Sequence, residues 1–268
     1  MQNVKVKELL FRLAKDVSPI MTISDIENYY PDLPRNTYIC TLQRMQKCGE
    51  AMLPWKGIYI ISPKEYFGEG EVHVREYLDV IMRNSGRGYY VALKDAIAEL
   101  ITSYENDCKT FHVIEDGKGL PNSLGKTVPA LSLNYTKHVP SSYIYTKETR
   151  FGYIKFATAE LTAIDLVTYI DSIGGLQASV DALKVLSSKL NFRRLNDDIF
   201  EYRSAANVQR LGYIIENVLG KPAKAQPLHD LLDKRYNKVY ARNALASALP
   251  LSHKIDKRWQ LDVNIELK

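Results

Sequence analysis

The sequence has few of the residues that build disulfide-stabilised, metal-binding or membrane-embedded proteins. Its three cysteines, Cys40, Cys48 and Cys108, form no CxxC pair, which argues against a disulfide framework and favours a reducing compartment. The five histidines are scattered, and no HExxH motif or Cys/His cluster has metal-site spacing. No segment reaches the ~18 consecutive apolar residues of a membrane span, and the N-terminal MQNVKVKELL contains no signal-peptide core. We therefore expect a cytoplasmic protein without metal, cofactor or membrane association.

The net charge excludes few classes of binding partner. A net charge of +5 and a pI near 8.9 are compatible with an anionic partner but do not require one. The composition, 46% hydrophobic and 25% charged, is ordinary for a globular protein. A length of 268 residues suits a small N-terminal unit joined to a larger one.

The N-terminal residues predict three helices. Apolar residues at helical spacing indicate a first helix that ends near Asp16. Thr22 or Ser24 can cap a short second helix, because a side-chain oxygen there accepts from a free backbone N–H. A third helix has Pro34 in its first turn, where the missing N–H costs nothing, and it stops at Gly49.

Two short strands follow the third helix, at 51–54 and 58–61, with Lys56 in the turn between them. Three helices, the second of them short, followed by a hairpin are typical of a winged helix-turn-helix. Residues 1–62 are therefore predicted to form this domain, whose third helix enters the DNA major groove.

The third helix is expected to turn apolar residues such as Tyr38 and Leu42 inward and a polar face outward. Arginine and lysine suit guanine or phosphate, asparagine and glutamine suit adenine, and threonine suits phosphate. The predicted DNA-binding residues, with the hairpin residue included, are Arg35, Asn36, Thr37, Thr41, Gln43, Arg44, Lys47 and Lys56.

Other interpretations of this N-terminal domain stay open. Any solvated helix has a polar face, and winged helices also serve as protein–protein modules. Residues 1–62 hold eight basic and six acidic residues, so their charge does not decide between DNA and protein as the partner.

A linker is predicted at 63–71, and residues 72–268 are predicted to form a mixed α+β domain. Its expected helices lie at 72–82 and 89–101. Four strands are expected next, where the apolar period changes to two, at 110–114, 128–133, 142–146 and 152–156.

The stretch 156–220 is expected to be the C-terminal helical spine of the larger domain. Thr158 can cap its first helix, whose apolar residues recur at helical spacing from Leu161 to Ile170. The pair Gly174–Gly175 is expected to end that helix.

Several motifs in this domain identify a family. TAELTAIDLV begins at Thr158, GGL begins at Gly174, QRLGY begins at Gln209, and Trp259 precedes the Val–Asn pair at 263–264. In this order they resemble the AbiEi-type antitoxins of bacterial abortive-infection systems. The family commonly has proline where this sequence has alanine, directly before the glutamate of the first motif. The resemblance extends over nearly the whole chain.

The resemblance implies the antitoxin of a toxin–antitoxin pair that serves phage defence. The winged helix would bind inverted repeats in its own promoter, as monomer or dimer, and repress the operon. The C-terminal domain would neutralise a nucleotidyltransferase-like toxin, and no small-molecule substrate is implied. The alternative is an ordinary transcription regulator or an interaction adaptor whose C-terminal domain senses a ligand, without a toxin.

Exposed basic residues are the candidates for toxin contact. Such a surface would bind an acidic face of the toxin, compete for nucleic acid at the toxin's site, or simply be solvated. The last four candidates recur at near-helical spacing. The six residues are Arg193, Arg194, Lys234, Arg235, Lys238 and Arg242.

No catalytic residue is expected. Glu160 and Asp165 are five apart on one helix and do not converge, as paired acid–base groups would. Asp165 is interpreted as solvated or paired with a nearby base, and Arg210 as its partner or as a toxin contact. The E-x-K triplet at Glu266 echoes a nuclease site, but an ordinary strand at 262–268 explains it.

Overall fold

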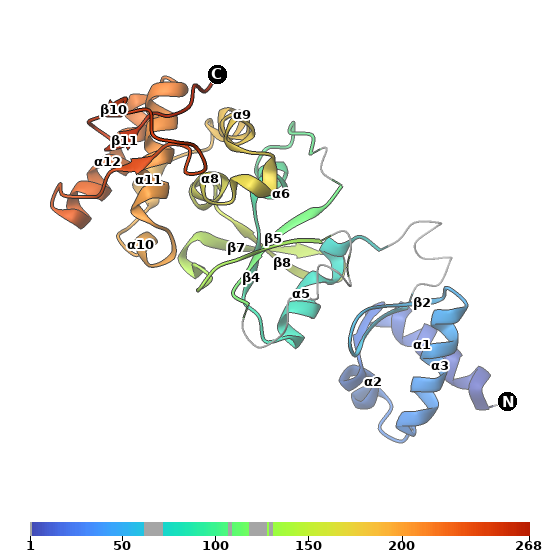
Figure 1. Cartoon of the computed structure of the whole chain (residues 1–268). Coiled ribbons are helices and arrows are strands. Elements are labelled where there is room, and N and C mark those ends of the chain that lie inside the picture. The colour runs from blue at the N-terminus through green and yellow to red at the C-terminus, as the bar shows by residue number, and fades with distance from the viewer. Residues whose placement is uncertain (1, 62–71, 107–108, 118–127, 129–130) are drawn as a thin grey trace. The chain divides into compact units, whose positions relative to one another are not determined.

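The computed structural model describes residues 2–61, 72–106, 109–117, 128 and 131–268, and the predicted linker at 63–71 lies outside them (Figure 1). The chain divides into two compact units. The first comprises Met1–Arg87, Gly117–Leu131 and Thr146–Ile154, and the second comprises Gly88–Asp116, Ser132–Tyr145 and Lys155–Lys268. Helices and several sheets occur together, so the predicted mixed α+β class is confirmed.

The first unit opens with helices and a small sheet in alternation. In chain order the elements are α1 (Gln2–Asp16), β1 (Ile20–Thr22), α2 (Ile23–Tyr29), α3 (Arg35–Lys47), β2 (Ala51–Trp55) and β3 (Ile58–Ile61). The strands form an antiparallel sheet of order β1–β3–β2. Strand β1 was not predicted from the sequence, because three residues show no period and become a strand only by pairing with β3. The helix α5 (Val74–Asn84) also belongs to this unit.

The helix boundaries in this unit follow local chemistry. Thr22 caps α2 as predicted, and it forms a reciprocal capping box in which each of Thr22 and Asp25 accepts the other's backbone N–H, at 3.1 and 2.7 Å. Pro34 is the residue before α3 and not part of its first turn. Gly49 has φ +71° directly after the helix, which confirms the predicted stop.

The core of the N-terminal elements fixes which face of α3 is free. Tyr38, Leu42 and Met45 are buried and pack in one cluster with residues of α1 and β3. Because these residues lie on one side of α3, the opposite side faces solvent.

A five-stranded sheet has the order β6–β5–β4–β8–β7, and all of β4 and β5 and most of β6 belong to the second unit. Its strands are β4 (Tyr89–Val91), β5 (Phe111–Glu115), β6 (Leu131–Tyr135), β7 (Ile144–Thr149) and β8 (Gly152–Ala157). The central strand β4 pairs antiparallel with β5 and parallel with β8. The four strands predicted from the change of period are all present, with boundaries shifted by a few residues.

The expected helix at 89–101 is wrong in its first part. Tyr89–Val91 forms β4, and only α6 (Leu93–Leu100) is helical. Two tyrosines and a valine favour a strand, and neighbours on both sides satisfy the backbone of β4.

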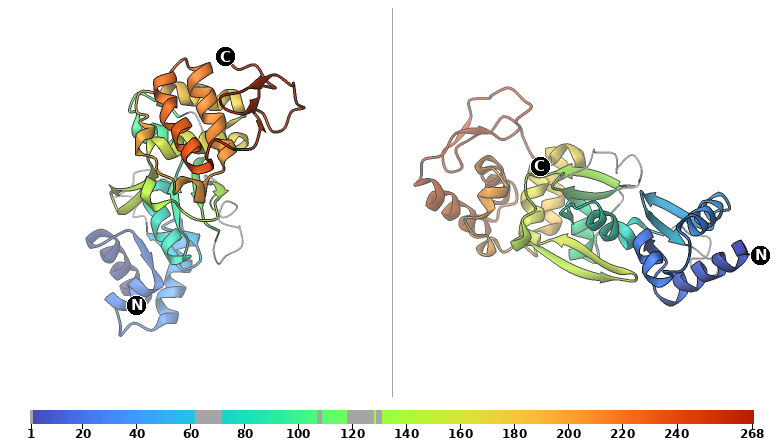
Figure 2. Two further views of the ribbon diagram at one scale, coloured as in Figure 1. Left: turned by 90° about the vertical axis from the view of Figure 1, so that its left-hand side faces the viewer. Right: turned by 90° about the horizontal axis from the view of Figure 1, so that it is seen from below.

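Helices follow the sheet along the chain. They are α8 (Ala159–Thr168), α9 (Leu176–Leu186), α10 (Ile199–Tyr202), α11 (Ala205–Tyr213), a π-helical turn (Ile214–Val218) and α12 (Pro222–Tyr236). Helix α8 packs against α6, α9 and α11, and α11 packs against α12. Figure 2 shows this succession from the sheet through α8 and α9 to the orange helices near the C-terminus.

Helix α8 is the centre of the unit. Every residue from Ala159 to Val167 is buried, so the helix is surrounded by protein and has no solvated face. Thr158 caps it as predicted, accepting from the backbone N–H of Leu161 at 3.4 Å. The predicted end at Gly174 is wrong, because α8 stops at Thr168 and a separate 3₁₀ turn intervenes before the glycine.

A small sheet of order β10–β11–β9 completes the unit, formed by β9 (Asn243–Ala244), β10 (Ile255–Asp256) and β11 (Leu261–Asp262). The expected strand at 262–268 is wrong, because pairing ends at Asp262. Lys268 is instead held on α9, where its backbone N–H and carbonyl bond to the Gln177 amide at 3.1 and 2.9 Å.

Candidate functional site

The outer face of α3 carries four of the eight residues predicted to contact DNA. Asn36, Gln43, Arg44 and Lys47 are exposed on this helix, opposite the buried face that packs on α1. Lys56 is exposed in the turn between β2 and β3, where Gly57 adopts φ +77°. Two long cations and two amides on one helix face are donors and acceptors suited to phosphate and base edges.

Of the two predicted threonines, Thr41 does not join this face and Thr37 is only partly exposed. Thr41 is only 3% exposed, and its hydroxyl donates to the backbone carbonyl of Thr37 at 2.8 Å. Thr37 is itself half-buried. The expectation that Thr41 lies outward is therefore wrong, because its position in the helix turns it toward the core and its hydroxyl bonds within the helix.

Arg35 is held at the start of α3 by an acidic residue of α2. Its guanidinium lies 2.8 Å from Glu27, whose carboxylate also accepts from the Tyr38 hydroxyl at 2.7 Å. Burial and the hydrogen bond to Glu27 raise the pKa of Tyr38 to about 12, so the hydroxyl remains a donor. The Arg35 side chain is 63% exposed and remains accessible to a second anion.

The second unit separates the six basic residues that were predicted to contact a toxin. Arg193 and Lys234 line one groove, whereas Arg194 and Arg235 are exposed beside it. The predicted helical spacing does not extend to Lys238 and Arg242, because α12 ends at Tyr236 and the next residue adopts the left-handed conformation. The six residues therefore do not form one basic helix face.

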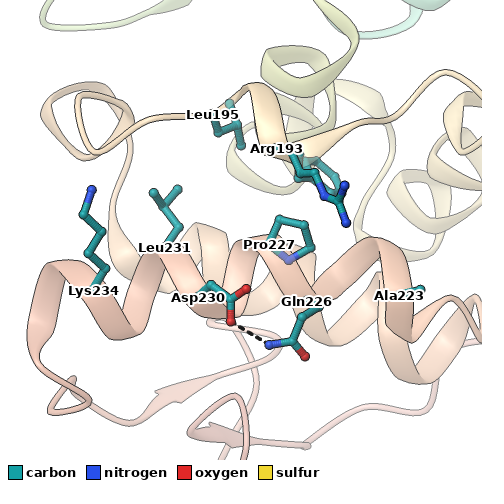
Figure 3. Close-up of a pocket in the computed structure, with 9 residues that line it drawn as sticks. Arg193, Leu195, Ala223, Gln226, Pro227, Asp230, Leu231 and Lys234 are labelled. Carbon is teal, nitrogen blue, oxygen red and sulfur yellow. Dashed lines mark hydrogen bonds between the residues drawn. The ribbon is translucent and has the colours of Figure 1, made fainter.

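The groove runs between α12 and the turn at Phe192–Arg194, and it encloses about 550 Å³. Leu195 and Leu231 provide buried apolar surface in it. Figure 3 shows Arg193 over Pro227 and Lys234 toward the other end of the groove. The lining also contains Gln226 and Asp230, and Lys234 lies 3.3 Å from Asp197, so cations and carboxylates both border the groove.

A buried ion pair joins α8 to Arg203, the residue that directly follows α10. Arg203 donates to Asp165 from Nε at 2.8 Å and from Nη2 at 2.6 Å, and the two side chains are 2% and 0% exposed. The Tyr90 hydroxyl of β4 donates to the other carboxylate oxygen at 3.0 Å. Burial opposes the charge on Arg203, but Asp165, Tyr90 and Tyr169 together outweigh burial and raise the pKa of this guanidinium. The pair is therefore a packed junction of sheet and helices, not an exposed site.

The predicted partner of Asp165 was the wrong arginine. Arg210 donates to the carbonyl of Ala244 at 3.0 Å and to Asn207 at 3.3 Å. No sequence pattern pointed to Arg203, which follows the four-residue helix α10 and belongs to none of the family motifs. Its role depends on a contact between residues 38 apart in the chain.

Several motif residues prove to hold the structure together. Gln209 is buried, and its amide donates to the carbonyls of Ala241 and Trp259 at 3.0 and 2.9 Å. The Trp259 ring is fully buried against Gly212, and its Nε1 donates to Glu216 at 3.0 Å. The QRLGY motif and Trp259 therefore meet in space and tie the terminal segment to α11.

The remaining acidic candidates are engaged in packing. Glu160 is 2% exposed and accepts the backbone N–H of Asn191 at 3.1 Å. Within the described part of the chain, no group of three or more His, Cys, Asp or Glu side chains could hold a metal ion. None of the helices seen there is long and apolar enough to cross a bilayer.

Comparison with known proteins found a matching family model and a solved structure with a similar fold. Residues 118–217 match the family model of the AbiEi antitoxin C-terminal domain, which confirms the family resemblance seen in the motifs. The crystal structure of the RV2827C protein from Mycobacterium tuberculosis is similar with a TM-score of 0.64 and 18% identity. That similarity covers 94% of this chain and 89% of the other, and at this identity it concerns the fold alone. The search of curated proteins found no match.

Proposed function

The chain carries an AbiEi antitoxin C-terminal domain at residues 118–217, and from this premise we propose that it neutralises a nucleotidyltransferase-like toxin and represses its own operon. The family match is the observation that carries the proposal, because it supports an antitoxin role in a toxin–antitoxin system. Neutralisation is assigned to the C-terminal domain, and operator binding to the N-terminal elements. In this proposal the protein acts in the cytoplasm and serves phage defence.

The proposed DNA-binding module is a winged helix-turn-helix. Its support is the element order from α1 to the β2–β3 hairpin, together with the exposed polar face of α3. In this proposal α3 enters the major groove and Lys56 of the wing contacts the adjacent backbone. Arg44 and Lys47 supply the charge, and Asn36 and Gln43 meet base edges.

The antitoxin role is tested by growth. Cells that express the protein encoded by the adjacent gene are expected to stop growing, and co-expression of this chain is expected to restore growth. A neighbouring gene product that is harmless would contradict the proposal and favour a plain transcription regulator or adaptor. A toxic neighbour that this chain fails to counter would contradict it as well.

The DNA-binding proposal predicts a separation of the two activities. The double variant Arg44→Ala, Lys47→Ala is expected to bind the operon's own promoter about 100-fold more weakly, because base and phosphate contacts are lost together. It is expected to restore growth as well as the wild type does. Fluorescence anisotropy with a labelled promoter fragment, at several salt concentrations, measures the affinity.

A matched control removes the same charge from a different helix. Lys5 and Arg12 are exposed on α1, and their double alanine variant is expected to keep most of the promoter affinity. Equal losses in the two double variants would show that only net charge matters, and α3 would not be the recognition helix. Unchanged affinity of the α3 variant would overturn the assignment directly.

A further inference from the structure

A carboxylate of α2 meets two donors of α3 at a single oxygen atom. Glu27 Oε1 accepts from Arg35 Nη1 at 2.8 Å and from the Tyr38 hydroxyl at 2.7 Å. Arg35 is the first residue of α3, and Tyr38 follows one helical turn later. The two bonds therefore connect the second helix of the proposed helix-turn-helix to the third, at the end where the third helix begins.

The Tyr38 hydroxyl makes this contact different from an ordinary surface ion pair. The Tyr38 side chain is 0% exposed and packs in the core cluster of the N-terminal elements, so its hydroxyl has a fixed position. Glu27 is 41% exposed, but this bond ties its carboxylate to the core. An exposed ion pair usually adds little, because two mobile side chains must lose rotamer freedom to form it. Here the buried hydroxyl already orders the acidic partner.

The Arg35 guanidinium keeps donors for a second anion. Its side chain is 63% exposed, and Glu27 is the one protein group that bonds to it within the described ranges. A guanidinium has several N–H donors, and Glu27 accepts from Nη1 alone. The edge formed by Nε and Nη2 can therefore bind a phosphate through two parallel hydrogen bonds.

We propose that Glu27 is a positioning residue for DNA binding, which holds Arg35 with this edge toward a backbone phosphate of the operator. The inference rests on the proposed winged-helix function and deepens it by assigning a phosphate contact and the residue that orders it. In a helix-turn-helix, the helix before the recognition helix crosses the DNA backbone. A side chain tied from α3 to α2 lies beside that backbone, where contacts to phosphate fix the register of the protein on the duplex.

Charge alone predicts the opposite effect for Glu27. A carboxylate near DNA repels the phosphates, so its removal would strengthen binding if its negative charge were all that mattered. Positioning predicts weaker binding, because a released Arg35 must lose its rotamer freedom when it meets the phosphate. The sign of the change in affinity therefore decides between the two roles.

Three single variants measure that sign. Glu27→Ala is expected to bind the operon's own promoter about fivefold more weakly than the wild type, because it releases Arg35. Glu27→Gln is expected to bind at least as tightly as the wild type, since one amide oxygen accepts from both donors and the negative charge is gone. Glu8 is exposed on α1, and Glu8→Ala removes the same charge without an expected loss. Fluorescence anisotropy with the full chain and a labelled promoter fragment measures all three.

A double variant tests whether Glu27 acts through Arg35. Arg35→Ala is expected to weaken promoter binding about tenfold and to reduce the slope of log affinity against log salt by about one, as for one lost phosphate contact. In the Arg35→Ala background, Glu27→Ala is expected to cause no further loss. Melting curves followed by circular dichroism check folding. If Glu27→Ala unfolds, Glu27→Gln and Arg35→Ala still test the contact, because both keep an acceptor for Tyr38.

The outcomes separate this role from DNA binding itself. Glu27→Ala that binds the promoter as tightly as the wild type, or more tightly, overturns the positioning role and leaves the proposed operator binding intact. Equal losses from Glu27→Ala with and without Arg35 overturn it too, because the carboxylate would then act independently of the guanidinium. Unchanged affinity and salt slope in Arg35→Ala would remove the phosphate contact. Failure of the proposed function gives a different result, in which the wild type itself does not bind the promoter specifically.

Discussion

Replacing Arg203 by alanine is expected to lower the free energy of unfolding by about 3–5 kcal/mol, because it leaves Asp165 buried without its counter-charge. The carboxylate is 0% exposed and would keep only the 3.0 Å hydrogen bond from Tyr90. Urea unfolding followed by circular dichroism measures the change. The exposed Arg194 serves as a control, since its alanine variant is expected to change stability by less than about 0.5 kcal/mol.

A double variant tests whether the cost comes from the stranded charge. Replacing Arg203 by methionine and Asp165 by leucine removes both charges and fills similar volume. This variant is expected to be more stable than either single replacement, because no buried ion remains without a partner. Losses that simply add would contradict a direct pair and would assign each residue a separate packing role.

The second large effect is expected at Gly212, where α11 meets the Trp259 ring. A Cβ at this position would lie 2.0 Å from Trp259 Cζ3 and 2.1 Å from Cη2, far inside van der Waals contact. The ring has no room to yield, since it is fully buried and its Nε1 is bonded to Glu216. Gly212→Ala is therefore expected to destabilise the chain by about 3 kcal/mol, measured as a lower urea midpoint.

Shortening the aromatic ring is expected to relieve this clash. The atoms nearest the added methyl belong to the six-membered ring of the Trp259 indole. A phenylalanine ring at this position would not reach as far toward Gly212. In the Trp259→Phe background, the Gly212→Ala change is expected to cost clearly less than in the wild type. An equal cost in both backgrounds would place the effect in the backbone of α11 and not in the ring contact.

Sequence patterns predicted the elements whose rules are local. The end of α1, the Thr22 cap and the stop at Gly49 depend on residues within one helical turn of each boundary, and all three are present. The period of two after Lys109 likewise predicted strands that the structure contains. The inward set of α3 followed from spacing, except at Thr41, which lies at the edge between the two faces.

The predictions from sequence were wrong where contacts between residues distant in the chain determine the local structure. Tyr89–Val91 has apolar residues that fit a helix or a strand, and pairing with β5 and β8 makes it a strand. Arg210 was predicted to pair with Asp165 because the positions around it in the sequence are core-like. Burial of Asp165 beside Arg203 depends instead on how α8 and the residues before α11 pack.

The candidate sites differ in the same way. The outer face of α3 could be predicted from the sequence, because one helix carries all of it. The helical period of the apolar residues separates the buried side of that helix from the exposed side. The groove could not be predicted, since Arg193 and Lys234 come to line it only when α12 packs against the turn at Phe192–Arg194. The sequence did not distinguish these two residues from the other four predicted basic residues, which lie outside the groove lining.

By itself, the sequence determined the mixed class, the capped helices near the N-terminus and the family, because short-range propensities and ordered motifs encode them. The tertiary structure decided what the motif residues do. Gln209, Gly212 and Trp259 proved to be packing and bonding partners of one another. It also decided which two of six cations share a groove, since those contacts form only when the chain buries its apolar surface.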